Sequence, residues 1–216
     1  MRTYLLLVAL AVAAGAARER SWERTRGSQD DDFGVSDRQR SRLNPLTASE
    51  NPSTNYIRIK TEILRLNNDG GIKSNGASCD VFGTCDPVCY ANLDTERPNA
   101  DWPGAKPDTT WMTVFGVDDN NSPIINVAIH KDICGAAYHE ANLRVKCMDR
   151  DPATKDDLIN EFDCPINRLP SRTESAKDWS PITNCLPRHV PDKMGLTFRY
   201  QVYRIPKSEC NATLAR

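Results

Sequence analysis

The sequence has no excess of charge of one sign, since 28 lysines and arginines nearly balance 29 aspartates and glutamates in 216 residues. No basic stripe alternates with aromatic residues, so we expect no nucleic acid partner. No apolar run reaches the ~20 residues that span a bilayer, so we expect no transmembrane segment. Nothing longer than a turn has helical periodicity, which favours a chain of strands and turns.

Catalytic and zinc-binding motifs are also missing. His139-Glu140 is followed by Leu143 at the position where the motif His-Glu-x-x-His needs a second histidine. No Gly-x-Ser-x-Gly sequence marks a serine hydrolase, and no Cys-x-x-Cys is present. Cys134 lies near His139, but we interpret it as half of a cystine and not as a catalytic thiol. We therefore predict that the protein is not an enzyme.

The chain begins with a pattern typical of a secretory signal peptide. Residues 1–17 contain a charged start, a short apolar run and small residues at the cleavage position. We therefore expect a secreted, extracellular protein, in which Asn211 of Asn211-Ala-Thr213 is a candidate glycosylation site. Residues 18–55 are polar and have no hydrophobic period, which predicts a disordered leader. The Arg38–Arg42 run in this leader is either a processing site or solvated charge.

Eight cysteines follow the predicted signal peptide. Their even number and the oxidising compartment favour disulfides over zinc ligation. Each native bridge contributes roughly 2–4 kcal/mol to stability, mostly by restricting the unfolded chain. Their spacing alone does not select a pairing. The cysteines are Cys79, Cys85, Cys89, Cys134, Cys147, Cys164, Cys185 and Cys210.

Alternating apolar residues predict strands from Tyr56 onward. Ile57–Ile63 alternates apolar and polar residues, as a half-buried strand does, and turn residues follow at Asn67–Gly71. We predict an all-β fold, an eight-stranded antiparallel β-sandwich with disulfides over residues 56–206, and a short C-terminal tail at 207–216. The other strand candidates are 87–93, 110–117, 124–129, 141–148, 160–166, a segment near 179–186, and 196–203.

Six aspartates lie in two short segments at the ends of predicted strands, Asp80 to Asp86 and Asp149 to Asp157. Brought together, their carboxylates would form an oxygen-rich cage suited to calcium. Without a cation, each pair would repel by roughly 3 kcal/mol at ~5 Å and an effective dielectric of ~20. Aspartate beside glycine or proline is also ordinary turn chemistry, so Asp80 and Asp86 alone do not establish a metal site.

These segments resemble the motifs of C2 domains. Asp80-x-x-Gly83-x-Cys85-Asp86-Pro87 resembles the family signature Asp-x-x-Gly-x-Ser-Asp-Pro-Tyr-Val, with Cys85 in place of the serine. The stretch from Leu143 to Ile159 resembles the second calcium loop, and Asn121-Ser-Pro123-Ile-Ile-Asn126 resembles an element of the fourth strand. The resemblance extends from about residue 56 to residue 205.

The resemblance implies a β-sandwich that holds calcium between loops at one end. Thr154 falls where some members use a serine as an additional ligand. Three cysteines adjoin these loops, and we expect bridges from Cys79, Cys85 and Cys147 to brace them. The ligand positions of the family fall on Asp80, Asp86, Asp149, Asp151 and Asp157.

Val81 and Phe82 lie between two of these ligand positions. In C2 domains that dock on membranes, apolar residues at this site enter the headgroup region, and calcium bridges to lipid phosphate. Two apolar residues here predict a membrane-contact loop, with Phe82 either reaching the lipid or folding back onto the core.

The resemblance and the signal peptide together predict a secreted calcium-binding module. We expect it to contact an anionic phospholipid surface or an extracellular protein through its calcium-end loops. The alternative is a calcium-independent adhesion or receptor-binding module that resembles the N-terminal C2 domain of Notch ligands, although nothing after Cys210 resembles their following modules.

Overall fold

The computed structural model describes residues 55–80, 84–151 and 155–216. The predicted signal peptide, all of the predicted leader except Asn55, the membrane-contact residues Val81 and Phe82, and Thr154 lie outside these residues. The strands are β1 (Tyr56–Asn67), β2 (Pro87–Asp94), β3 (Met112–Gly116), β4 (Ile124–Cys134), β5 (Ala141–Asp149), β6 (Asp157–Ile166), β7 (Thr183–Asn184), β8 (Leu186–Pro187) and β9 (Gly195–Arg204). Three short 3₁₀ turns complete the described elements, namely η1 (Asp108–Thr110), η2 (Ala176–Asp178) and η3 (Lys207–Glu209).

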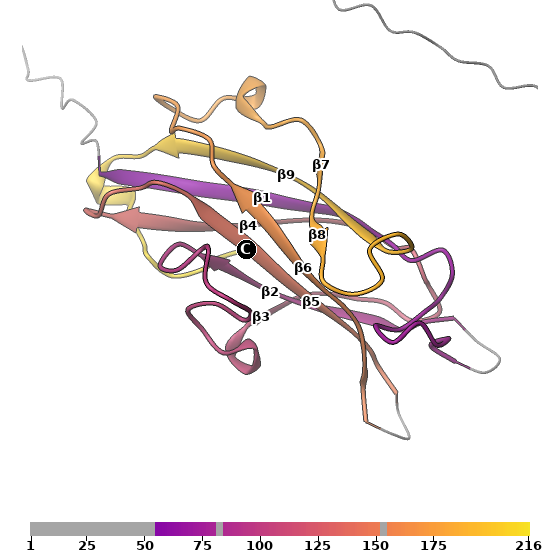
Figure 1. Ribbon diagram of the computed structural model, residues 1–216. Coiled ribbons are helices and arrows are strands. Elements are labelled where there is room, and N and C mark those ends of the chain that lie inside the picture. Colours follow the sequence, from indigo (N-terminus) through magenta and orange to yellow (C-terminus); the bar gives the residue numbers. More distant parts are fainter. Residues whose placement is uncertain (1–54, 81–83, 152–154) are drawn as a thin grey trace, which may run out of the picture. The chain divides into compact units, whose positions relative to one another are not determined.

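The strands form two sheets that pack face to face (Figure 1). One sheet has the order β4-β1-β9-β7 and the other has the order β3-β2-β5-β6-β8, and every strand pair is antiparallel. Ile59 and Phe198 of the first sheet and Leu143 and Phe162 of the second are fully buried in a shared core. This architecture confirms the predicted all-β antiparallel sandwich. None of the described residues forms a helix long and apolar enough to cross a membrane.

The alternation predicted for β1 is present, and it changes phase once. Ile57, Ile59 and Ile63 are buried, as a period of two requires. The register then shifts between Ile63 and Arg65 in the pairings with both β4 and β9. This irregularity turns Leu66 into the core in place of Arg65, and it twists the strand just before the loop that carries Asp80.

The segment predicted as one strand near residues 179–186 forms two very short strands in different sheets. β7 pairs with β9 in the first sheet, and β8 pairs with β6 in the second. Cys185 lies between them, is buried, and is bonded to Cys164 of β6. The chain therefore crosses from one sheet to the other at a disulfide, which gives nine strands among the described residues instead of eight.

The predicted C-terminal tail packs along β4. His130 and Ala215 exchange two backbone hydrogen bonds of 2.8 and 2.9 Å. Cys210 is bonded to Cys134 at the end of β4. The tail therefore continues the first sheet at its β4 edge.

Candidate functional site

The loop between β1 and β2 carries the first two aspartates. A bridge between Ile72 and Ser78 closes a small hairpin in this loop. A disulfide between Cys79 and Cys85, with a Cα–Cα distance of 5.2 Å, then ties the loop just before β2. Because Asp80 and Asp86 each follow one of these cysteines, the bridge fixes where both carboxylates leave the loop.

Asp86 and Asp149 are brought into direct contact by the pairing of β2 with β5. Pro87 lies opposite Asp149 at the end of this pair. The backbone N–H of Asp86 donates to Oδ1 of Asp149 at 2.7 Å, and the N–H of Arg150 donates to the carbonyl of Asp86 at 3.1 Å. Figure 1 shows this end of the sandwich, where β1 and β5 end and β2 and β6 begin. The two predicted ligand segments are therefore adjacent.

Asp149 is a buried carboxylate with an unpaired oxygen. It is 1% exposed, and its Oδ2 has no hydrogen-bond partner among the described residues. Burial raises the pKa of Asp149, and the charges of Asp80, Asp151 and Asp86 raise it further. A buried charge normally requires a counter-charge, and the carboxylates around Asp149 have the same sign.

Two further aspartates lie at the start of β6: Asp156 directly precedes the strand, and Asp157 is its first residue. The backbone N–H of Asp151 points to Oδ1 of Asp156 at 3.4 Å. Asp157 instead forms an ion pair with Lys73, whose Nζ lies 2.7 Å from Oδ2. This hydrogen bond raises the pKa of Lys73. One predicted ligand thus already has a cationic partner.

No protein-family model matches the sequence, and no curated protein matches it. Among solved structures, the crystal structure of a C2 domain protein from Ramazzottius varieornatus is 29% identical and superposes with a TM-score of 0.68. The match covers 73% of this chain and 94% of that one. The described part of the chain forms a C2 domain. The family resemblance seen in the sequence is thereby confirmed.

Two more distant structures score below a TM-score of 0.5. A C2 domain of plant extended synaptotagmin 1 is 10% identical with a TM-score of 0.46, and the match covers 68% of this chain and 95% of that one. The Drosophila C2-DSL-EGF1 structure is 11% identical with a TM-score of 0.46, and the match covers 68% and 67%. We draw nothing about function from either.

The cysteines of this C2 domain form four disulfides. Cys89 and Cys147 join β2 to β5, the two strands that bring Asp86 to Asp149. Ligand atoms of Cys79, Cys85 and Asp149 lie within 4.8 Å of one another. The two sulfurs are bonded to each other and offer no thiolate. They therefore lie beside the carboxylate of Asp149 but do not compete with it as metal ligands.

The donor set of the C2 domain therefore fits a hard cation better than a soft one. The candidate donors are carboxylate oxygens of both loops, and no free cysteine is present among the described residues. In the described structure no three of the five proposed carboxylates lie within 4.8 Å of one another, so calcium would have to draw them together. Calcium takes about six to eight oxygen ligands and tolerates irregular geometry. Oδ2 of Asp149 is a buried carboxylate oxygen that has no hydrogen-bond partner among the described residues, and it is therefore available to such a cation.

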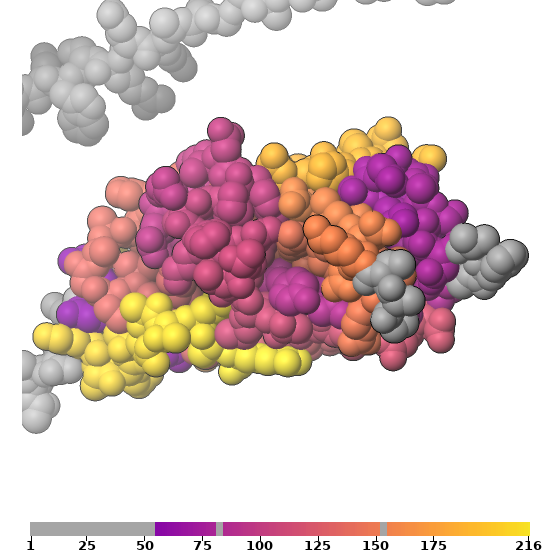
Figure 2. All heavy atoms as spheres, turned by 90° about the horizontal axis from the view of Figure 1, so that it is seen from below, coloured from indigo at the N-terminus to yellow at the C-terminus, as the bar shows by residue number. Residues whose placement is uncertain are grey.

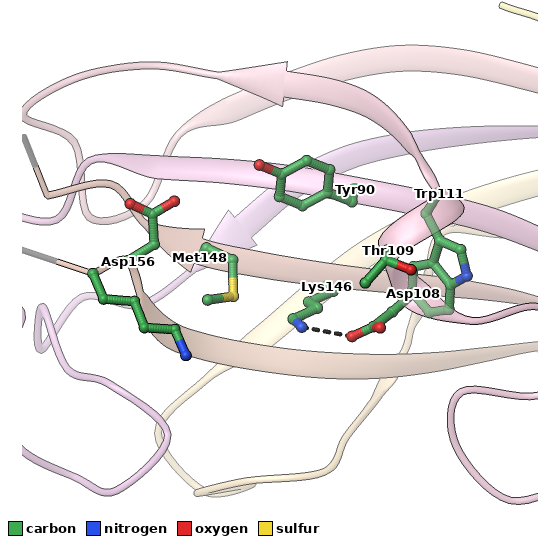
Figure 3. Close-up of a pocket in the computed structure, with 8 residues that line it drawn as sticks. Tyr90, Asp108, Thr109, Trp111, Lys146, Met148 and Asp156 are labelled. Carbon is green, nitrogen blue, oxygen red and sulfur yellow. Dashed lines mark hydrogen bonds and ion pairs between the residues drawn. The ribbon is translucent and has the colours of Figure 1, made fainter.

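A groove of about 630 Å³ lies on the outer face of the second sheet (Figure 3). Tyr90 and Met148 lie between its two ends, and Asp156 stands at the end next to the proposed metal ligands. At the other end, Lys146 and Asp108 form an ion pair of 2.6 Å. The groove has charged residues at both ends and an apolar floor, and the sequence did not indicate it because residues from four separate segments of the chain line it.

Sequence reasoning missed the contacts of three residues that shape the loops. Asn121 accepts the N–H of Cys85 through its Oδ1 at 2.7 Å. A Cβ on Gly71, which has a φ of +54°, would lie 2.8 Å from the amide of Asn121, so this position needs glycine. Lys73 was missed because its partner is remote in sequence, although a lone lysine in a turn-rich loop before Asp80 was a usable signal. Asn211, the predicted glycosylation site, is exposed.

Proposed function

We propose that this C2 domain is a secreted calcium-binding module that contacts phospholipid or an extracellular protein through the loops around the ion. The observation that carries the proposal is the buried Oδ2 of Asp149, which has no hydrogen-bond partner among the described residues and whose carboxyl group has its pKa raised by burial and by the charges of Asp80, Asp151 and Asp86. A bound cation removes both the unpaired oxygen and the repulsion. The proposed calcium ligands are Asp80, Asp86, Asp149, Asp151 and Asp157.

Calcium at this end supplies the positive charge through which a neutral protein attracts anionic lipid. The chain has a formal net charge of −1, so overall charge gives no such attraction. The chain's own contribution is to hold the carboxylates in place. The bond between Cys79 and Cys85 and the contact between Asp86 and Asp149 do this in the described structure.

The four disulfides indicate an oxidising environment, which supports secretion. Extracellular modules bind calcium at about 10⁻⁴–10⁻³ M. We therefore propose that calcium is bound constitutively and orders the loops for a binding partner. The proposal assigns no catalytic role.

Calorimetric titration with calcium tests the first step. The wild type should bind calcium, and the double variant Asp149→Asn/Asp151→Asn should give no binding heat. The variant Asp178→Asn/Glu209→Gln is a matched control, because it removes two carboxylates, one in η2 and one in η3, that are not among the proposed ligands. Equal heats from the wild type and the Asp149→Asn/Asp151→Asn variant would end the calcium proposal.

Co-sedimentation with vesicles containing phosphatidylserine tests the second step. The wild type should pellet with vesicles in calcium and stay in solution in chelator. The variant Val81→Ser/Phe82→Ser tests the membrane-contact loop proposed from the sequence, and it should retain calcium binding while losing lipid. Pelleting that is equal in calcium and chelator would remove calcium-dependent lipid binding, and binding to cell-surface protein in chelator would favour the adhesion alternative.

A further inference from the structure

Lys73 is a tethered cation beside the carboxylates of the proposed calcium site. Its Nζ lies 2.7 Å from Oδ2 of Asp157, and only 19% of its side chain is exposed. The charges of Asp151 and Asp149 also act on this ammonium group. It is therefore in contact with one of the five proposed ligands and feels the charge of two others.

The backbone around Lys73 fixes this placement. Within the hairpin, the N–H of Lys73 donates to the carbonyl of Ala77 at 2.7 Å, and the N–H of Gly76 donates back to Lys73 at 2.8 Å. The N–H of Ser74 donates to the carbonyl of Leu158 at 2.9 Å, which attaches the hairpin to β6. In Figure 2 this loop, in purple, lies against the orange segment at the start of β6. The backbone around Lys73 is therefore held both within the hairpin and against β6.

We propose that Lys73 is the internal counter-ion of this site, which a divalent cation must displace from Asp157 in order to bind. This inference rests on the proposed calcium-binding function. Two cations a few ångström apart repel each other, the more so where protein excludes water. Breaking the ion pair is then part of the free energy of calcium binding, and it keeps the affinity low.

Removing the charge of Lys73 should strengthen calcium binding but weaken the calcium-free fold. Lys73→Met keeps most of the aliphatic chain and removes the charge, so the dissociation constant for calcium should fall about tenfold. The same variant should lower the calcium-free thermal midpoint by roughly 2 °C, because the carboxylates lose their counter-ion. Lys73→Arg keeps the charge and should leave both quantities within about threefold and 1 °C of the wild type.

The experiment is calcium titration by calorimetry, with thermal denaturation in calcium-free buffer, on the whole chain. Lys60→Met is the matched control, because Lys60 forms an ion pair of 2.8 Å with Glu174, away from the proposed ligands. The expected result is tighter calcium binding in Lys73→Met and wild-type affinity in Lys60→Met. Lys73→Gln serves as a second neutral variant and should behave as Lys73→Met does.

The failures of the two proposals are distinguishable. If the wild type binds calcium and both neutral variants bind it with the same affinity, Lys73 is a structural ion pair and the inference is wrong. If the wild type shows no binding but the neutral variants bind, Lys73 opposes calcium and the proposed function fails for the natural chain. Absence of binding in all variants overturns both.

Discussion

Asp94 and Asp149 are two buried aspartates at opposite ends of the same pair of strands. Asp94 ends β2 and Asp149 ends β5, and each is 1% exposed. Because β2 and β5 run antiparallel, the two carboxylates lie at the two ends of one ladder. Burial is the same at both positions, so the difference between them comes from their partners.

The protein itself neutralises Asp94. Burial alone would raise the pKa of Asp94, but the N–H groups of Arg97, Ala105 and Glu96 and the charge of Arg144 hold it below its ordinary value. Arg144, also 1% exposed, reaches Asp163 at 2.8 Å and the carbonyl of Ala100 at 2.7 Å. This buried network folds the loop after β2 over the sheet and needs no further ion.

Asp149 has no such network among the described residues. One of its oxygens accepts an N–H, the other has no hydrogen-bond partner among those residues, and the charges of Asp80, Asp151 and Asp86 raise its pKa. The ammonium of Lys73 also acts on Asp149, but it is paired with Asp157. The loop beside Asp149 is tied by the disulfide from Cys79 to Cys85 and not by an arginine. Asp94 therefore stabilises the fold through hydrogen bonds and an arginine of its own chain, whereas Asp149 keeps one buried oxygen without a hydrogen-bond partner, which suits it to binding a cation.

The largest expected loss of stability comes from replacing Asp94, the aspartate that the protein itself neutralises. Asp94→Asn leaves Arg144 without one of its two carboxylate partners in a buried position, so the free energy of unfolding should fall by about 3 kcal/mol. Chemical denaturation in chelator and in calcium measures this loss. The loss should be the same in both solutions, and recovery by calcium would mean that the two ends do not differ as described.

The next effect tests whether the disulfide between Cys79 and Cys85 holds the loop near Asp149 in place for calcium binding. Cys79→Ser/Cys85→Ser opens a short loop and should cost about 2 kcal/mol. It should also weaken calcium binding, because Asp80 and Asp86 lose their fixed placement. The control Cys164→Ser/Cys185→Ser should cost more, about 3 kcal/mol, since its loop is longer. Calorimetry should find its calcium affinity unchanged, and equal weakening in both variants would contradict the bracing role.

A smaller effect of opposite sign sharpens the comparison. Asp149→Asn removes a buried charge among like charges, so it should raise the free energy of unfolding in chelator by about 1 kcal/mol. It should at the same time abolish the stabilisation that calcium gives the wild type. Denaturation with and without calcium measures both changes. A loss of stability in chelator would show that Asp149 has a structural partner after all.

The smallest effect is the pH dependence of stability in calcium-free buffer. Asp149 has a raised pKa, so its contribution to stability is present below the ordinary value of 3.8 and is lost as pH rises through the raised pKa. Asp94 has a lowered pKa, so its contribution is present above 3.8 and is lost as pH falls through the lowered pKa. The advantage of Asp149→Asn over the wild type should therefore grow as pH rises from about 4. The penalty of Asp94→Asn should shrink below about pH 4. Parallel pH profiles for the two variants would contradict the assignment.

The sequence was sufficient for the parts of the fold that depend on local pattern. Alternation predicted β1, and the family spacing predicted that the segments of Asp86 and Asp149 would meet. The disulfide pairing was not predictable, because it depends on which strands become neighbours. The division of one predicted strand into β7 and β8 likewise depends on Cys185 reaching Cys164 across the two sheets.

Charge partners were the least predictable feature of the site. Arg144 lies between two apolar residues of β5, so alternation predicts that its side chain is exposed. The loop after β2 instead buries it. Lys73 pairs with Asp157 over 84 positions of sequence. Both contacts are made by long side chains that reach across loops. The spacing of residues along the sequence does not predict which groups such side chains will meet.

The most direct test of the account is the crystal structure of the chain grown with calcium. We predict a calcium ion bonded to Oδ2 of Asp149 at about 2.4 Å, with oxygens of Asp80 and Asp86 in the same coordination shell. We also predict that Nζ of Lys73 has moved away from Asp157. A structure in saturating calcium in which Oδ2 of Asp149 contacts no metal, and in which the ion pair of Lys73 with Asp157 is intact, would contradict both predictions.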